Sequence, residues 1–526
     1  MPPPARLRPP TALAALLCAL VVTATPEGHT RQDGPVPRRQ VMADRGLAAI
    51  DRGFRPRDYA RAPRSARHLS RATEAAGASA EPYVRGSVLV KFAEGMTVSA
   101  TTAALSGTGA SPLTRPPQAD FDIVAIPHEA DPQAVAEALG ARPDVVWAQP
   151  RYRVHAMFRP NDPLYPFQWN FPALDMEGAW AINPGASRDI IVAVLDSGVA
   201  HRNITVRYRS AFDFRLSLGG PVFPALGLVD VPFATAPELG GAERFVAPWD
   251  FIWDDDLPVD LEGHGTHVAG TIGQLTNNGT GVAGMAFNVR LMPVKVLQEV
   301  WDFIFDSPGT GTDDTVARAI RYAADQGAQV INMSFGREGG GPATAVEEAI
   351  RYAVSRGAFV VVAAGNDRET GNRPNRIAEA APRIDGMVAV GAVGRDLRVA
   401  YYSTTGAHVE LAAPGGASRT GDSSGLILQQ TVDPDLLETY AFGPARFGPP
   451  RADAMAYHYL QGTSMAVPHV SGLAALLLQQ GITSPAAIEA AMTRFATDLG
   501  PPGRDNEYGH GLINPRATLR GLGLAR

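Results

Sequence analysis

The chain has 526 residues, of which 45% are hydrophobic and 19% are charged, a composition typical of a globular protein. Its formal net charge is −6, although residues 26–80 carry 11 Arg against 6 Asp and Glu. Residues 81–526 are therefore strongly acidic, which argues against nucleic-acid binding. The single cysteine is Cys18, so the chain beyond it has no disulfide, no thiol nucleophile and no cysteine-based metal site.

The first 25 residues have the pattern of a secretory signal peptide. Arg6 and Arg8 precede the apolar run "TALAALLCALVV", and "VTATPEG" supplies small residues for cleavage. The run is too short to span a bilayer. We expect a secreted protein, extracellular or periplasmic, with no membrane span. Lipid attachment at Cys18 is the alternative, and the large Leu17 before it disfavours that.

Two different segments follow the signal. Residues 26–80 are rich in Arg, Ala and Pro without sustained periodicity, which predicts a flexible leader. Residues 81–156 contain two strand patterns, "GSVLVKFAEG" and "FDIVAIP", and then a helix and a strand in "DPQAVAEALGARPDVVWAQP". This predicts a small α+β domain.

From about residue 160, strand and helix patterns alternate. The apolar runs "DIIVAVLDSG", "VRLMPVKVL", "AQVINMSFG", "GAFVVVAAGN" and "GMVAVGAV" are typical of strands buried on both faces. Residues 313–327 and 344–357 are helical patterns, and Thr344 and Glu347 have capping-box spacing. We predict an α/β fold over 160–526 with a doubly wound parallel sheet flanked by helices. Ligands bind beyond the carboxyl ends of such strands.

Ser464 lies in "LQGTSMAVPHVSG", directly before an apolar run that predicts a buried helix. Gly462 permits a tight turn before it, and Pro468 is compatible with a first helical turn. Free N–H groups and the positive end of the helix dipole would suit a developing oxyanion beside this hydroxyl. The alternative is a serine that only caps the helix.

His264 and Asp196 are the other candidate catalytic residues. His264, in "GHGTHVAGTIG", could act as a general base. The alternatives are a packed core histidine, or a metal pair with His267. Asp196, in "VAVLDSGVA", is a carboxylate at the end of an apolar strand, where burial requires a partner such as an imidazole. Its alternative role is an ordinary turn aspartate.

The order Asp196, His264, Ser464 is one of the few known orders for a catalytic triad. The motifs "DSG", "HGTHVAG", "VVAAGN" and "GTSMAVPHVSG", with the terminal "YGHGLINPRATL", resemble the subtilisin family of serine peptidases over residues 160–526. The resemblance implies that Ser464 is the nucleophile, His264 the base and Asp196 its orienting acid. Asn366 would donate to the oxyanion. The implied substrate-binding residues are Ser334, Phe335 and Gly336, which pair with the peptide backbone, and Ala363, Ala364 and Gly365, which line the pocket before the scissile bond.

The resemblance also suggests a calcium site and an inhibitory propeptide. The loop "LTNNGTGVAG" is similar to a family loop that binds Ca²⁺, and its implied ligands are Asn278, Leu275, Thr280, Val282 and Asp162. The acidic ligand expected soon after Asp196 is absent from "HRNITVRYR", and the acidic run 254–262 is an alternative site. The end of 81–156, "VVWAQPRYRVHA", resembles the tail of an inhibitory propeptide, which implies autocleavage within 153–161.

The sequence thus predicts a secreted, subtilisin-like serine endopeptidase that processes itself from a precursor. Its partners would be protein or peptide substrates and its own propeptide, and no cofactor is needed for the chemistry. We expect a monomer, with a structural Ca²⁺ as the only metal. Segments 201–250 and 416–457 are insertions of unassigned role. Two rival functions are a non-catalytic protein that holds peptides and an esterase that uses the same triad.

Overall fold

The computed structural model describes residues 38–43, 50–51, 83–105, 109–152, 158–217, 219–420 and 422–521. The chain divides into two compact units, one of residues 64–157 and one of residues 1–63 together with 158–526. The predicted signal peptide and Cys18 lie outside the described residues. Within the described part, no helix is both long and apolar enough to cross a membrane.

The smaller unit is the predicted α+β domain. Its strands are β3 (Tyr83–Phe92), β4 (Ser111–Thr114), β5 (Asp122–Ala125) and β6 (Val145–Tyr152), and its helices are α2 (Val98–Leu105) and α3 (Pro132–Gly140). The strands form one antiparallel sheet in the order β4-β5-β3-β6. Leu139 of α3 packs with Val88 and Val90 of β3 in its core. Of these elements, only α2 and β4 were not expected from the sequence.

The larger unit is built on a seven-stranded parallel sheet, which confirms the predicted α/β class. Its order is β10-β11-β7-β12-β13-β14-β15. The strands are β7 (Ile191–Asp196), β10 (Trp249–Asp250), β11 (Arg290–Lys295), β12 (Val330–Met333), β13 (Phe359–Ala363), β14 (Met387–Val393) and β15 (Leu411–Pro414). Successive side chains of a strand point to opposite faces, so Val192 and Val194 of β7 enter one core cluster while Ala193 and Leu195 enter another.

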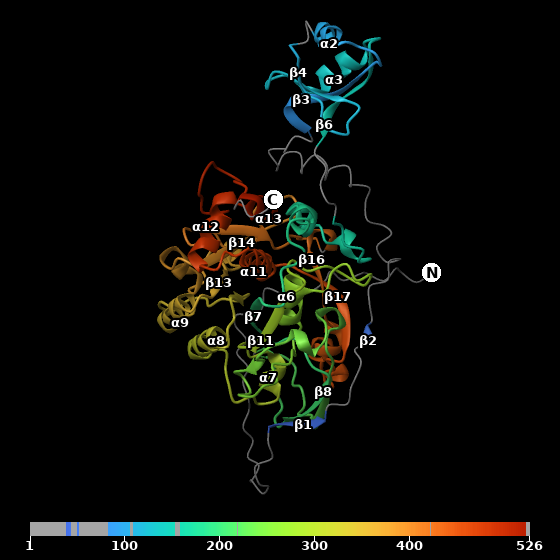
Figure 1. The fold of residues 1–526 in the computed structure, drawn as a ribbon. Coiled ribbons are helices and arrows are strands. Elements are labelled where there is room, and N and C mark those ends of the chain that lie inside the picture. Colours follow the sequence, from blue (N-terminus) through green and yellow to red (C-terminus); the bar gives the residue numbers. More distant parts are fainter. Residues whose placement is uncertain are drawn as a thin grey trace, which may run out of the picture. The chain divides into compact units, whose positions relative to one another are not determined.

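Helices cover both faces of this sheet. Helices α6 (His264–Gly273) and α11 (Thr463–Gln479) share the core cluster of Val192, whereas α8 (Asp313–Asp325) and α9 (Thr344–Ser355) lie side by side over the face of Ala193 (Figure 1). The other α-helices among the described residues of this unit are α4 (Asn170–Ala173), α5 (Met176–Trp180), α7 (Val300–Ile304), α10 (Pro434–Leu437), α12 (Pro485–Phe495) and α13 (Pro515–Gly521).

Two helix-terminus predictions were wrong. Helix α9 has Ala343 as its N-cap and no side-chain cap, because Thr344 is already inside the helix, so the predicted capping box is absent. Pro468 lies beyond the first turn of α11, which begins at Thr463. Proline has no N–H to donate to the carbonyl four residues earlier, that of Ser464. The Ser334 hydroxyl donates to that carbonyl instead, at 2.9 Å.

The two predicted insertions form hairpins that contact each other. The first contains β8 (Ile204–Ser210) and β9 (Gly227–Phe233), and the second contains β16 (Ile427–Val432) and β17 (Ala454–Leu460). The backbone of Ala452 accepts a hydrogen bond from Ala234 N at 3.1 Å and donates one to Pro232 O at 2.9 Å. The insertions therefore stabilise one another beside the sheet.

Part of the expected flexible leader is strand. Segment β1 (Arg39–Ala43) pairs antiparallel with β8, and β2 (Ile50–Asp51) pairs in parallel with β17. The prediction of a flexible leader is therefore wrong for these residues. Short strands of this kind take their backbone hydrogen bonds from an existing sheet edge, so they need no hydrophobic periodicity of their own.

Candidate active site

Asp196 and His264 meet where β7 ends and α6 begins. His264 Nδ1 lies 2.7 Å from Asp196 Oδ1, which also accepts from Ser197 N at 2.8 Å. The Asp196 side chain is 0% exposed. The close approach requires glycine at the second residue of α6, since a Cβ on Gly265 would lie 2.0 Å from Gly198 O. Both side chains are therefore positioned by regular secondary structure.

The surrounding charges favour a protonated imidazole. Burial acts to lower the pKa of His264, but the charge and hydrogen bond of Asp196 outweigh it and raise this pKa to about 10. A second carboxylate, that of Glu262, accepts from His264 N at 2.7 Å, and burial raises its pKa to about 7. With Nδ1 bonded to Asp196, Nε2 of His264 makes no hydrogen bond to any described residue and is the nitrogen available for proton transfer.

Ser464 is the second residue of α11, but its hydroxyl is not bonded to His264. Ser464 Oγ donates to Ser334 O at 2.8 Å, and Ser334 Oγ donates back to Ser464 O at 2.9 Å. Ser334 follows directly on β12, so this reciprocal pair ties the start of α11 to the carboxyl end of the sheet. In this arrangement the Ser464 hydroxyl is therefore bonded to the sheet and not to the His264 imidazole.

Asn366 lies beside the same helix start. Its side-chain oxygen accepts from Thr463 N at 3.0 Å and from Thr463 Oγ1 at 2.9 Å. Gly462, the N-cap of α11, has φ 153°, and a Cβ there would lie 3.6 Å from Asn366 Nδ2. Because Thr463 holds the oxygen end, the amide nitrogen is left to donate to a group placed near the N-terminus of α11.

The two segments predicted to bind substrate follow adjacent strands, and one buried asparagine bridges them. Residues 334–336 follow β12, and residues 363–365 end and follow β13. Asn375, 2% exposed, donates from Nδ2 to Ala363 O at 2.6 Å and to Phe335 O at 3.2 Å. A Cβ on Gly336 would lie 2.4 Å from Asn375 Nδ2. The Asn375 side chain therefore fills the space between residues 334–336 and residues 363–365.

Sequence reasoning missed Asn375. Its only local signal is the preceding Pro374 in a polar stretch, and that pattern is also typical of an ordinary turn. Its side-chain oxygen accepts from the backbone N of Arg337 and of Ile377, each at 3.0 Å, so all of its bonds go to the backbone of three separate segments. No motif could reveal such a role.

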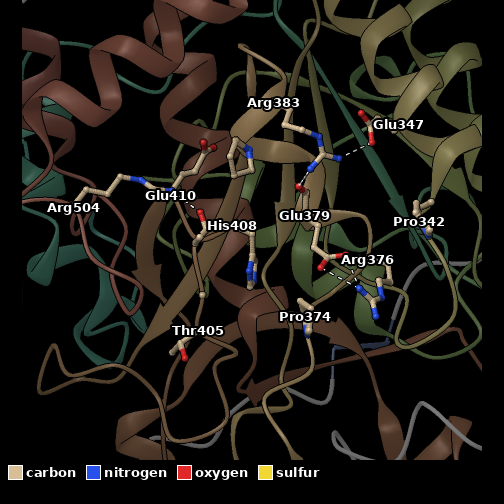
Figure 2. Close-up of a pocket in the computed structure, with 14 residues that line it drawn as sticks. Pro342, Glu347, Pro374, Arg376, Glu379, Arg383, Thr405, His408, Glu410 and Arg504 are labelled. Carbon is tan, nitrogen blue, oxygen red and sulfur yellow. Dashed lines mark hydrogen bonds and ion pairs between the residues drawn. The ribbon is translucent and has the colours of Figure 1, made fainter.

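A pocket of about 810 Å³ lies apart from these residues, and none of the predicted triad residues lines it (Figure 2). Its charged lining residues are Glu347, Arg376, Glu379, Arg383, Glu410 and Arg504, with His408 among them. Figure 2 shows Glu379 directed at Arg376, with which it forms an ion pair at 3.0 Å. Because its charge is already paired, Glu379 offers little preference for basic substrate residues.

The loop with the predicted calcium ligands folds around Asp162. The two carboxylate oxygens accept from Asn277 N at 2.7 Å and Asn278 N at 3.3 Å, and Asn278 Oδ1 accepts from Thr280 N at 2.8 Å. No group of three or more His, Cys, Asp or Glu side chains that could hold a metal occurs among the described residues. Calcium at this loop stays a prediction.

His267 does not pair with His264. Its Nε2 donates to the carbonyls of Ile427, at 3.1 Å, and His458, at 3.2 Å, and burial lowers its pKa to about 3. This is a packed core histidine. In the acidic run 254–262, Asp260 is likewise committed to protein contacts, since it accepts from Thr266 N at 2.9 Å.

Residues 187–511 match the Subtilase family, and residues 70–151 match the fervidolysin N-terminal prodomain. The thermophilic serine proteinase of Bacillus sp. strain AK1 is 33% identical over 430 residues, 81% of this chain and 86% of that protein. Thermitase of Thermoactinomyces vulgaris is 31% identical over 68% of this chain and 98% of its own. The solved structure of a protease from Pseudoalteromonas arctica is 27% identical, with a TM-score of 0.50 over 69% of this chain and 99% of its own. The chain belongs to the Subtilase family and is a subtilisin-like serine endopeptidase with an N-terminal prodomain.

Proposed function

We propose that Ser464, His264 and Asp196 form the catalytic triad of this endopeptidase and that it hydrolyses peptide bonds through an acyl-enzyme. The observation that carries the proposal is the 2.7 Å contact between the buried Asp196 carboxylate and His264 Nδ1. This bond fixes the tautomer in which Nε2 can accept a proton, and it stabilises the imidazolium that results.

The reaction begins when Ser464 Oγ leaves its bond to Ser334 O and gives its proton to His264 Nε2 while attacking the substrate carbonyl. The imidazolium then protonates the leaving amine, and a water activated by the same nitrogen hydrolyses the ester. Asn366 Nδ2 and the backbone N–H of Ser464 donate to the oxyanion. The N-terminus of α11 adds its positive dipole end.

The substrate binds as an extended strand along residues 334–336, which exchange main-chain hydrogen bonds with it. Displacement of the Ser464 hydroxyl from Ser334 O frees that carbonyl for this pairing. The residue before the scissile bond enters the space between these residues and 363–365. Because Asn375 bridges the two walls, that residue is small.

The enzyme is made as an exported, monomeric precursor that cleaves itself within residues 153–161. Support comes from the N-terminal signal pattern and from the prodomain match, which ends at residue 151. Strand β6 ends at Tyr152, so the cut falls just after the last strand of the prodomain. The prodomain then acts as an intramolecular inhibitor, and Ca²⁺ at the Asp162 loop would have a structural role only.

The test is labelling with a fluorophosphonate, which reacts only with an activated serine. We expect label on Ser464 in the wild type and none in Ser464→Ala, which also accumulates as uncleaved precursor. A matched control is Ser471→Ala, a buried serine of the same helix that bonds to Asn332, which keeps the label. A folded wild type that takes no label once its prodomain is removed contradicts the triad and favours a peptide-holding protein. Label with turnover of esters alone indicates an esterase.

A further inference from the structure

The leader segment 38–43 is part of the catalytic unit in this structure. Strand β1 pairs with β8 in the register Arg39 to Tyr208, Gln40 to Arg207 and Val41 to Val206, and it completes a three-stranded sheet, β1-β8-β9. An additional backbone bond runs from Arg209 N to Arg38 O at 3.2 Å. Strand β8 belongs to the first insertion, whose role the sequence left open.

The side chain of Arg39 is buried in a pocket of opposite charge. It is 5% exposed, and its Nη1 donates to Asp250 Oδ2 at 3.0 Å and lies 3.5 Å from Asp255 Oδ2. Its Nη2 donates to Leu257 O at 2.6 Å. The guanidinium also lies over two aromatic rings, 5.4 Å from the centroid of Trp253 and 5.7 Å from that of Tyr208. Figure 1 shows the two strands concerned, β1 and β8, next to each other. Charge, planar hydrogen bonding and ring stacking together select an arginine over a lysine.

The pocket depends on this arginine for its charge balance. Asp250 is 0% exposed, its Oδ1 accepts from Ile252 N and Trp253 N, and its Oδ2 is left to Arg39. No other described residue forms an ion pair with Asp250. Removing one partner of a buried pair leaves an uncompensated charge, which is costly. The empty pocket is therefore unfavourable, and the occupied one resists loss of the segment.

The neighbouring Arg38 has none of these features. Its side chain is 53% exposed and lies 3.3 Å from an exposed carboxylate, that of Asp306. Surface pairs of this kind contribute little. Two adjacent arginines of one segment thus differ in burial and partners, and Arg38 is a matched control for Arg39.

We propose that residues 38–43 are a permanent strand of the catalytic unit, anchored by Arg39, and that the leader fragment stays bound after its covalent link is cut. The β8 edge and the pocket of Asp250, Asp255, Tyr208 and Trp253 form a binding site for an extended, arginine-bearing segment, which is the chain's own leader. The proposal rests on the proposed function only for the self-cleavage that cuts the link in the natural precursor.

The experiment separates retention from catalysis. A full-length Ser464→Ala chain receives a recognition site for a specific protease between residues 63 and 64, the boundary of the two units. After this external cut, gel filtration and mass spectrometry measure whether the leader fragment stays with the rest of the chain. We expect retention in this chain and with Arg38→Ala, and about a hundred-fold weaker retention with Arg39→Ala, the effect expected when a buried, hydrogen-bonded charge is truncated.

A second variant guards against a folding defect. Asp255→Asn removes one of the two acids but keeps an oxygen that can accept from Leu257 N, and we expect faster loss of the fragment from a normally folded chain. Prompt loss of the fragment from the parent chain, or equal retention with Arg39→Ala and Arg38→Ala, overturns the proposal. The self-processed wild type should also carry the fragment. A wild type that fails to cut itself would contradict the proposed function. The externally cut Ser464→Ala chain would still decide whether the leader is retained.

Discussion

The substitution Asp196→Asn tests the proposed triad most directly, because it changes the charge of one buried group and almost nothing of its shape. Asp196 Oδ1 accepts both His264 Nδ1–H and Ser197 N–H, while Oδ2 is buried without a hydrogen-bond partner among the described residues. An amide that keeps its oxygen toward both donors buries an unpaired NH₂ group. The opposite orientation donates to Nδ1 and moves the imidazole proton to Nε2, where it blocks proton acceptance.

Either orientation removes the negative charge that stabilises the imidazolium. We expect kcat/KM to fall about 10⁴-fold, the loss that this change causes in other serine peptidase triads. At about 1.4 kcal/mol for each factor of ten, this is about 5.5 kcal/mol of transition-state stabilisation. The assay is hydrolysis of a chromogenic peptide by purified, externally processed enzyme, with the fold checked by circular dichroism.

The pH profile supplies a second, independent readout. The base must be neutral to accept a proton, so activity rises as pH passes through the pKa of His264. Since Asp196 raises this pKa to about 10, the acid limb of the wild type lies above the ordinary value of about 6.5. In Asp196→Asn the largest influence that raises the pKa of His264 is gone and only the weaker effects of Glu262 and Glu299 oppose burial, so the limb moves to lower pH. A loss below ten-fold with an unshifted limb would refute the assigned role.

Three further changes test the surroundings of the triad. Asn366→Leu removes the proposed oxyanion donor, and kcat should fall about 10²- to 10³-fold with KM nearly unchanged. A rise in KM with no fall in kcat would contradict the role. Lys295→Met breaks an ion pair with Asp302 in which both side chains are 0% exposed, so the free energy of unfolding should fall by about 3–5 kcal/mol. An unchanged Tm in thermal unfolding would contradict a stabilising role for this pair. Asn375→Gly opens the space between the substrate-binding segments, and a peptide library should show a shift from small to larger residues before the cut, which a wild type already selective for large residues would disprove.

Local pattern was sufficient where one segment determines its own structure. The apolar run ending at Asp196 forms a buried central strand, as predicted. The glycine-rich stretch after His264 forms a helix that packs closely against Gly198, because Gly265 has no side chain to prevent it. These two elements determine where Asp196 and His264 lie in the fold. The same holds for the prodomain helix, whose cap Asp131 accepts from Gln133 N as a cap should.

Contacts between segments that are distant along the chain could not be predicted from the sequence. The bond from Ser464 Oγ to Ser334 O joins residues 130 apart, and the bridge made by Asn375 depends on two strands being neighbours. Strand β1 is the extreme case, because Arg39 is one of many arginines in a polar leader and only its partner strand distinguishes it. Such roles exist only once the sheet has formed, so no local propensity encodes them.

The leader pocket and the candidate active site are joined by contiguous buried contacts. Arg39 lies over the ring of Trp253, whose Nε1 donates to Asp302 Oδ1 at 2.8 Å. Asp302 in turn pairs with Lys295 at 2.8 Å, and Lys295 Nζ donates to the carbonyl of Ser197, the residue after Asp196, at 2.5 Å. Each of these charges is buried and needs its neighbour, so the network is stable only when complete. Arg39 of the leader supplies the outermost cation of this network, so a retained leader would support the end of β7, where Asp196 lies, and its loss should weaken the position of that carboxylate.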